Sequence, residues 1–158
     1  MPDGLYERDV LAWSEQQATL LRRLARGERV NDLDWEHVAE EIEDVGLSEL
    51  HAVHSFLTQI LVHLMTLRGW PGSGARFHWR GEIVAFQTSA RRRFVPSMRQ
   101  RIDLPEIYGD TARQIGQLRR GNTPAIAPAR LCPVTLDQLL TEPVEVLEAA
   151  FQASEPDG

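Results

Sequence analysis

Residues 34–46, DWEHVAEEIEDVG, and residues 47–68, LSELHAVHSFLTQILVHLMTLR, decide the fold of this chain. In the first segment, apolar residues recur at spacings of three and four, which is the repeat of an amphipathic helix. These residues are Trp35, Val38, Ile42 and Val45. Asp34 is a suitable N-cap, and Gly46 is a suitable C-cap because glycine adopts the left-handed conformation without steric cost. We therefore expect the two segments to form a helical hairpin that turns at Gly46.

Apolar residues cover most of the circumference of the second helix, which we expect over residues 48–68. A helix with one wet side does not carry two adjacent apolar stripes, so we place this helix at the centre of a bundle. The stripes contain Leu50, Leu57, Leu61 and Leu64, and Val53, Phe56, Ile60 and Leu67. The richest apolar run, residues 56–67, is shorter than the roughly 20 residues that cross a bilayer, so we predict no membrane span.

The length of 158 residues predicts a single domain. We expect a frayed C-terminal tail from about residue 152. The N-terminus has neither a basic start nor an apolar signal core. The single cysteine, Cys132, excludes an internal disulfide and a multi-cysteine zinc site. These features fit a reducing cytoplasm, and we expect a cytoplasmic protein.

Every one of the 17 basic residues is an arginine. The absence of lysine excludes a P-loop lysine and a Schiff-base lysine. The net charge of −6 argues against general attraction to nucleic acid or anionic lipid. The charge is uneven, because residues 28–49 are strongly acidic and residues 76–101 are basic.

Three further helical regions follow from caps and breaks elsewhere in the chain. We expect one helix from Asp9 to Gly27, one from about residue 75 to 94, and one that starts at Pro105. The pattern Thr135-x-x-Gln138 is a capping box that opens a last short helix. No alternating strand pattern is present. The fold class is therefore all-α, a small helical bundle of four or five main helices around the central apolar helix at about 48–68.

Several short motifs, in their order and spacing, resemble the bacterial family called domain of unknown function 29. They are Leu5-Tyr6, Asp9, Leu33-Asp34-Trp35, Glu40-Glu41-Ile42-Glu43, Gly46, Ser48-Glu49, His63-Leu64, Trp79, Pro96-Ser97, Tyr108-x-x-x-Ala112-Arg113, Cys132-Pro133 and Thr135-Leu136. The resemblance covers nearly the whole chain and implies a small all-helical bacterial protein. It implies no reaction. The chain departs from the pattern at Thr66-Leu67-Arg68, where a basic or aromatic residue often follows the histidine helix.

A divalent-metal site is one candidate for chemistry. A hairpin that turns at Gly46 would bring Glu41 or Asp44 near His51 and His54, and imidazole with carboxylate suits zinc, iron or manganese. The alternative is a solvated acidic face with histidines at a helix start. His63 lies apart in the apolar stretch, where we favour a core histidine bonded to a carboxylate or carbonyl over a general base.

An interaction surface is the other candidate. Trp70 and Trp79 flank a Gly-rich loop where an apolar patch could form, next to the basic residues Arg80, Arg91, Arg92 and Arg93. Nucleic-acid binding is disfavoured by the net charge, so a protein partner or self-association fits better. Because no catalytic constellation assembles, we expect a non-catalytic protein-interaction or accessory module without a cofactor. The competing hypothesis is a metal-dependent hydrolase or other small metalloenzyme that uses the acidic and histidine hairpin.

Overall fold

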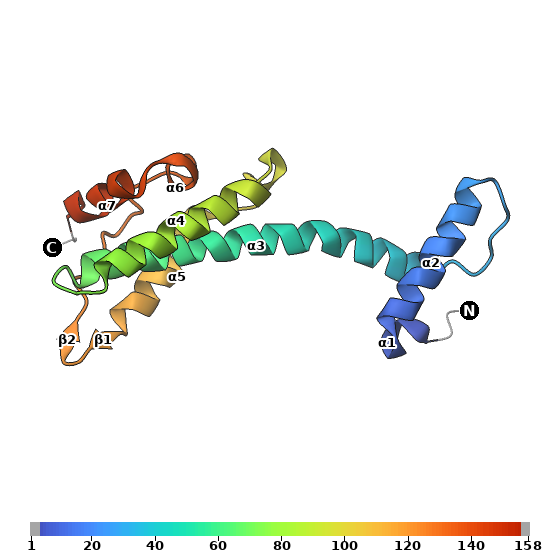
Figure 1. The fold of residues 1–158 in the computed structure, drawn as a ribbon, viewed down its shortest axis with the longest axis horizontal. Coiled ribbons are helices and arrows are strands. Elements are labelled where there is room, and N and C mark those ends of the chain that lie inside the picture. Colours follow the sequence, from blue (N-terminus) through green and yellow to red (C-terminus); the bar gives the residue numbers. More distant parts are fainter. Residues whose placement is uncertain (1–3, 156–158) are drawn as a thin grey trace. The chain divides into compact units, whose positions relative to one another are not determined.

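A computed structural model describes residues 4–155 and confirms the all-α class (Figure 1). The elements in chain order are α1 (Leu5–Arg8), α2 (Val10–Ala25), α3 (Trp35–Gly69), α4 (Arg76–Arg93), the 3-10 turn η1 (Pro96–Met98), α5 (Leu104–Gly116), β1 (Arg119–Arg120), β2 (Thr123–Pro124), α6 (Leu136–Thr141) and α7 (Val144–Ala153).

The predicted hairpin at Gly46 is wrong, because α3 continues without a break from Trp35 to Gly69. Gly46 does not have the positive φ that a left-handed C-cap requires; Gly4, Gly27 and Gly121 do. A glycine inside a helix costs only about 1 kcal/mol relative to alanine. A turn would instead leave the carbonyl groups of the last turn without intrahelical partners. Glycine allows a helix to end at this position. Here the helical hydrogen bonds of the backbone continue through Gly46 instead.

The chain divides into two compact units, Met1–Ser48 and Glu49–Gly158, which we call the N-terminal and C-terminal units. The N-terminal unit has a small core of Trp13, Leu33 and Val38, against which Leu5, Tyr6, Leu20, Leu21 and Val30 pack. Of the apolar stripe predicted for residues 34–46, only Val38 is buried. The single domain expected from length stays a prediction.

The C-terminal unit contains the main core, and the second half of α3 contributes most to it. Val53, Leu57, Ile60, Leu61 and Leu64 are completely buried, which confirms this stretch as the central apolar helix. Helix α4 adds buried residues to the core and packs against α6 and α7. Among the described residues, α3 is the one helix long and apolar enough to cross a membrane, a test that the core helix of a soluble protein also passes. The predicted cytoplasmic location stays a prediction.

Two predicted N-caps are confirmed. The carboxylate of Asp9 accepts a hydrogen bond from the amide of Ala12 at 3.0 Å, and Thr135 forms the full capping box with Gln138. One short antiparallel hairpin, β1 with β2, was not expected. Gly121 lies in its turn with φ of 63°. Helix α7 extends to Ala153, so residues 152 and 153 are helical rather than frayed.

Candidate functional site

A buried polar cluster joins α2 to the start of α3 in the N-terminal unit. Asp34 precedes α3 and is only 8% exposed. Its carboxylate accepts hydrogen bonds from the indole N–H of Trp13 at 3.1 Å and from Nδ1 of His37 at 2.7 Å. Its backbone N–H donates to the side-chain oxygen of Gln17 at 2.8 Å. Asp34 is therefore satisfied on every side by α2 and by the first turn of α3.

Asp34 and His37 form a hydrogen-bonded pair in which the pKa of Asp34 is lowered and the pKa of His37 is raised. Burial acts to raise the pKa of the Asp34 carboxyl, but the hydrogen bonds from His37 and Trp13 outweigh it and lower that pKa. The hydrogen bond to Asp34 raises the pKa of His37 above its ordinary value. The Tyr6 ring stacks on the imidazole, with ring centroids 3.9 Å apart. The pair can hold a proton, and it ties α1 and α2 to α3.

Tyr6 also engages one of the predicted metal ligands. Its hydroxyl donates to Oε1 of Glu41 at 2.6 Å, and this hydrogen bond is the main reason that the pKa of Tyr6 rises to about 12. Reasoning from periodicity did not find the roles of Tyr6, Trp13 and Gln17. The family motifs Leu5-Tyr6 and Leu33-Asp34-Trp35 are the signal that could have assigned Tyr6 and Asp34 to one cluster.

The structure does not bring the proposed metal ligands together. Glu41 and His51 lie on one continuous helix, where ten residues correspond to a rise of about 15 Å. Asp44, His51 and His54 are exposed. Within residues 4–155, no group of three or more His, Cys, Asp or Glu side chains is placed to hold a metal ion. The geometric premise of this site is wrong, and metal binding itself stays a prediction.

Trp70 and Trp79 do not supply the apolar patch expected at the Gly-rich loop, because both are buried. Trp70 and Trp79 are each 7% exposed. The indole N–H of Trp70 donates to the carbonyl of Thr123 at 3.1 Å, and the guanidinium of Arg120 lies 4.8 Å from the ring centre of Trp79. The unpredicted β-hairpin supplies both contacts, and the large apolar area of the indoles favours this burial.

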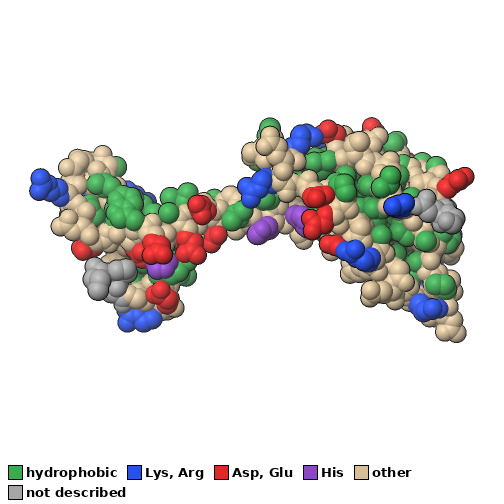
Figure 2. All heavy atoms as spheres, turned by 180° about the vertical axis from the view of Figure 1, so that it is seen from behind, with side chains coloured by type: hydrophobic (Ala, Val, Ile, Leu, Met, Phe, Trp, Pro, Cys, Tyr) green, Lys and Arg blue, Asp and Glu red, His purple; other side chains and the backbone are tan. Residues whose placement is uncertain are grey.

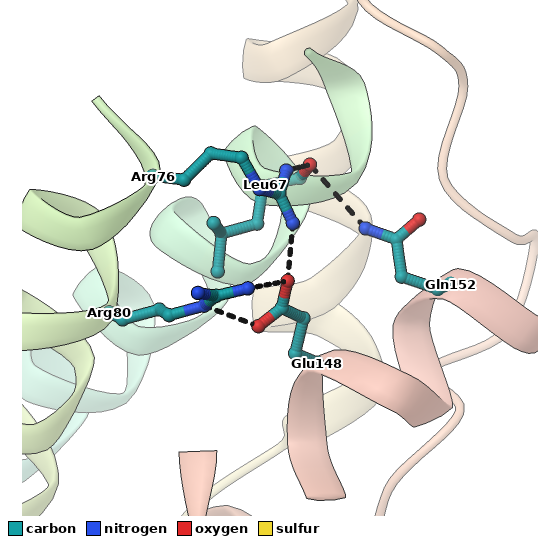
Figure 3. A network of polar contacts seen from close by, with 5 residues as sticks. All are labelled: Leu67, Arg76, Arg80, Glu148 and Gln152. Atoms are coloured by element: carbon teal, nitrogen blue, oxygen red, sulfur yellow. Dashed lines mark hydrogen bonds and ion pairs between the residues drawn. The ribbon is translucent and has the colours of Figure 1, made fainter. Parts of the chain in front are cut away.

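Arg80 is likewise committed to the fold rather than free for a partner (Figure 3). Its guanidinium binds both oxygens of Glu148, at 2.7 and 2.9 Å, and Arg76 binds the same carboxylate. The hydrogen bond from Arg80 is the largest cause that lowers the pKa of Glu148. Arg76 and Gln152 also donate to the carbonyl of Leu67. This network fastens α7 to α3 and α4.

The three consecutive arginines at the end of α4 are exposed, but they have different contacts. Arg91 donates to the carbonyl of Leu140 at 3.3 Å, and Arg93 forms an ion pair with Glu49 at 3.1 Å. The side chain of Arg92 has no polar or ionic contact with any residue that the structure describes. Of the predicted basic surface, Arg92 is thus the side chain most available to a partner.

His63 occupies the half-buried position that the apolar stretch predicted. Its Nδ1–H donates to the carbonyl of Gln59 at 2.7 Å, which identifies Nδ1 as the protonated nitrogen because a carbonyl only accepts. The ring centre lies 5.7 Å from that of Phe86. The partial burial and the hydrogen bond to a carbonyl are the contacts that we expected of His63 as a core histidine.

The exposed face of the first half of α3 is the strongest candidate for binding. Trp35, Ile42 and Val45 are 62%, 67% and 70% exposed, although their spacing places them on one side of the helix. We call these three residues the α3 docking face. Glu41 and Glu43 adjoin Ile42 in sequence and so lie about 100° to either side of it. Figure 2 shows hydrophobic side chains on the surface of this unit with carboxylates beside them.

Two comparisons place the chain among known proteins. The family described as "Domain of unknown function DUF29" matches residues 5–144. A crystal structure of an alpha-helical protein of unknown function from Rhodospirillum rubrum, at 1.45 Å resolution, is 31% identical with a TM-score of 0.65. The match covers 95% of this chain and 98% of the other. No curated protein matches the sequence.

Proposed function

The chain belongs to the DUF29 family, whose description assigns no activity, and we propose from its surface that it is a non-catalytic protein-interaction module. The observation that carries this proposal is the exposure of all three residues of the α3 docking face. Scattered exposed apolar residues are ordinary, but several along one helix face are typical of interaction sites.

The energetics favour a partner for this face. Full burial of a large apolar side chain contributes about 1.5–3 kcal/mol, so covering Trp35, Ile42 and Val45 is a substantial driving force. Tryptophan is also among the residues that most often dominate binding energy at interfaces. The three residues offer a ridge to an apolar partner, rather than a pocket for a small ligand.

The charge around the face defines the chemistry of the partner. The N-terminal unit has twelve acidic residues and five arginines, which gives a net charge of −7. Glu43, which lies about 100° around the helix from Ile42, forms no ion pair with any of residues 4–155. The complementary partner is a protein segment that combines apolar side chains with arginine or lysine.

The test compares which proteins three purified forms of the chain capture from an extract of the native cell. The first form is the wild type, and the second has Ile42→Ser and Val45→Ser. The third has Val84→Ser and Val146→Ser, which makes the same chemical change at two residues that are each 48% exposed on α4 and α7.

We expect the wild type and the control to retain the same basic proteins, and the docking-face variant to lose them. Salt should weaken the capture, because exposed charge pairs are screened. Circular dichroism checks that all three forms are folded. Identical capture by all three forms would contradict the proposal.

A further inference from the structure

We infer that the β1–β2 hairpin is a second interaction surface, which binds a carboxylate-rich segment of a partner protein. We call residues 119–124 the arginine hairpin. Its sequence, RRGNTP, contains two arginines and no acidic residue. More widely, residues 111–136 contain four arginines and neither aspartate nor glutamate, in a chain whose net charge is −6. This inference does not depend on the α3 docking face, which attracts a partner of the opposite charge.

The backbone of the arginine hairpin is fixed by contacts with the core helices. The strands pair so that Arg120 lies opposite Thr123, and a two-residue turn joins them. The indole N–H of Trp70 donates to the carbonyl of Thr123 at 3.1 Å. Just after the hairpin, the N–H of Ile126 donates to the carbonyl of Gly69 at 2.9 Å. Because these contacts already order the chain, binding requires little further loss of conformational entropy.

The arginine hairpin is nevertheless exposed to solvent. Every residue from 116 to 124 is exposed, and Figure 1 shows the two strands beyond the end of α5. The side chains of Arg119 and Arg120 form no ion pair or hydrogen bond with any of residues 4–155, whereas the nearby Arg113 pairs with Asp110. The hairpin therefore has two positive charges that the described part of the chain does not neutralise.

Arg120 is also held in position for a carboxylate. Its guanidinium lies over the ring of Trp79, 4.8 Å from the ring centre. A guanidinium above an indole keeps N–H donors at its edges, and two of these donors match the two oxygens of a carboxylate. Arg80 binds both oxygens of Glu148 in this way within the fold. Arg120 can make the same contact with a carboxylate from another protein.

An acidic protein segment fits the arginine hairpin better than nucleic acid, although arginine also binds phosphate. The net charge of −6 repels an extended polyanion more strongly than a short acidic segment. Residues 116–124 contain no aromatic side chain on which bases could stack. Leu118 directly precedes the hairpin and is 48% exposed, so it offers an apolar contact of the kind that protein interfaces use.

Fluorescence anisotropy with two labelled probes of equal charge tests this inference. One probe is a peptide of alternating glutamate and alanine, and the other is a single-stranded oligonucleotide. We expect the wild-type chain to bind the peptide more tightly than the oligonucleotide. Arg119→Gln combined with Arg120→Gln should weaken peptide binding about tenfold, because two ion pairs are lost. Arg120→Lys keeps the charge but loses the planar fork, and should weaken it about threefold.

A matched control separates the hairpin from overall charge. Arg92→Gln combined with Arg101→Gln removes the same charge at two exposed arginines that form no ion pair with residues 4–155. This control should keep the dissociation constant within about twofold of the wild-type value. Near-UV circular dichroism, which reports on the buried indoles, checks that each variant is folded. Arg119→Gln alone is the variant to use if the loss of Arg120 from Trp79 disturbs folding.

Peptide binding that the hairpin variants weaken and the control retains supports the inference. Three results overturn it: no peptide binding even at low salt, equal weakening by the hairpin and control variants, or tighter binding of the oligonucleotide than of the peptide. Capture of basic proteins by the α3 docking face is measured separately. Failure of either proposal is therefore distinguishable from failure of the other.

Discussion

Asp34 shows how one residue serves two structural purposes. As the N-cap expected from sequence, its carboxylate accepts the backbone N–H of His37 and satisfies a donor of the first helical turn. The same carboxylate binds the indole N–H of Trp13 and the imidazole of His37, which brings α2 to α3. A buried carboxylate is costly unless it is paired and hydrogen-bonded, and these contacts meet that requirement.

The Asp34–His37 pair predicts a pH-dependent stability. The pKa of His37 is raised in the folded state above its ordinary value of 6.5. Its stabilising contribution is therefore complete below about pH 6.5 and is lost as pH rises through the folded pKa. In urea titrations from about pH 5 to about pH 9, His37→Gln should remove this decrease in unfolding free energy. His54→Gln, at an exposed position, should keep it; equal slopes for wild type and His37→Gln would contradict the assignment.

At the scale of elements, α3 is continuous where the sequence predicted a break. Asp34 and Gly46 are ordinary cap residues, and together they favoured a short helix that ends at Gly46, followed by a separate long helix. Caps at Asp9 and Thr135 formed as predicted. At Gly46 the helix continues instead, and the three exposed residues of the α3 docking face lie on it without a covering helix.

Gly46→Ala tests this continuity directly. A Cβ added at Gly46 meets no atom within 4 Å, and a helical alanine loses less backbone entropy on folding than glycine. The substitution should therefore stabilise the chain by about 0.5–1 kcal/mol. Gly27→Ala is the matched control, because Gly27 has φ of 85° and alanine is strained there. Denaturant unfolding measures both changes. A loss of stability for Gly46→Ala would indicate a left-handed turn at that position.

At the scale of the whole molecule, the two units differ greatly in their cores. The N-terminal unit depends on Trp13, Leu33 and Val38, and on the polar cluster around Asp34. The C-terminal unit contains a much larger set of buried apolar residues and the arginine network of Arg76, Arg80 and Glu148. Because apolar burial is the dominant stabilising term, the N-terminal unit should open at lower free energy.

Hydrogen exchange measured by mass spectrometry tests this difference. Trp13→Ala removes a side chain that is 5% exposed and should cost about 3–5 kcal/mol locally. We expect exchange to become faster in α2 and unchanged in α4, α5 and α7. Leu57→Ala, in the larger core, should affect the C-terminal unit. Equal acceleration throughout the chain after Trp13→Ala would show that the two units open together.

Local patterns in the sequence determined the helices and the central apolar stretch. Helical periodicity, caps and prolines depend on neighbouring residues, so the all-α class, the buried residues of the second half of α3 and the family resemblance followed from sequence. The core position of His63 followed for the same reason, since its helical neighbours are apolar.

Tertiary structure alone decided which surfaces are covered. Whether Gly46 ends a helix depends on hydrogen bonds that a cap pattern does not specify. Trp70 and Trp79 became core residues because a hairpin distant in sequence covers them, whereas Trp35, Ile42 and Val45 remain exposed because no described element lies over them. Burial depends on contacts between residues far apart in the chain, and a periodic pattern records only that a face is apolar.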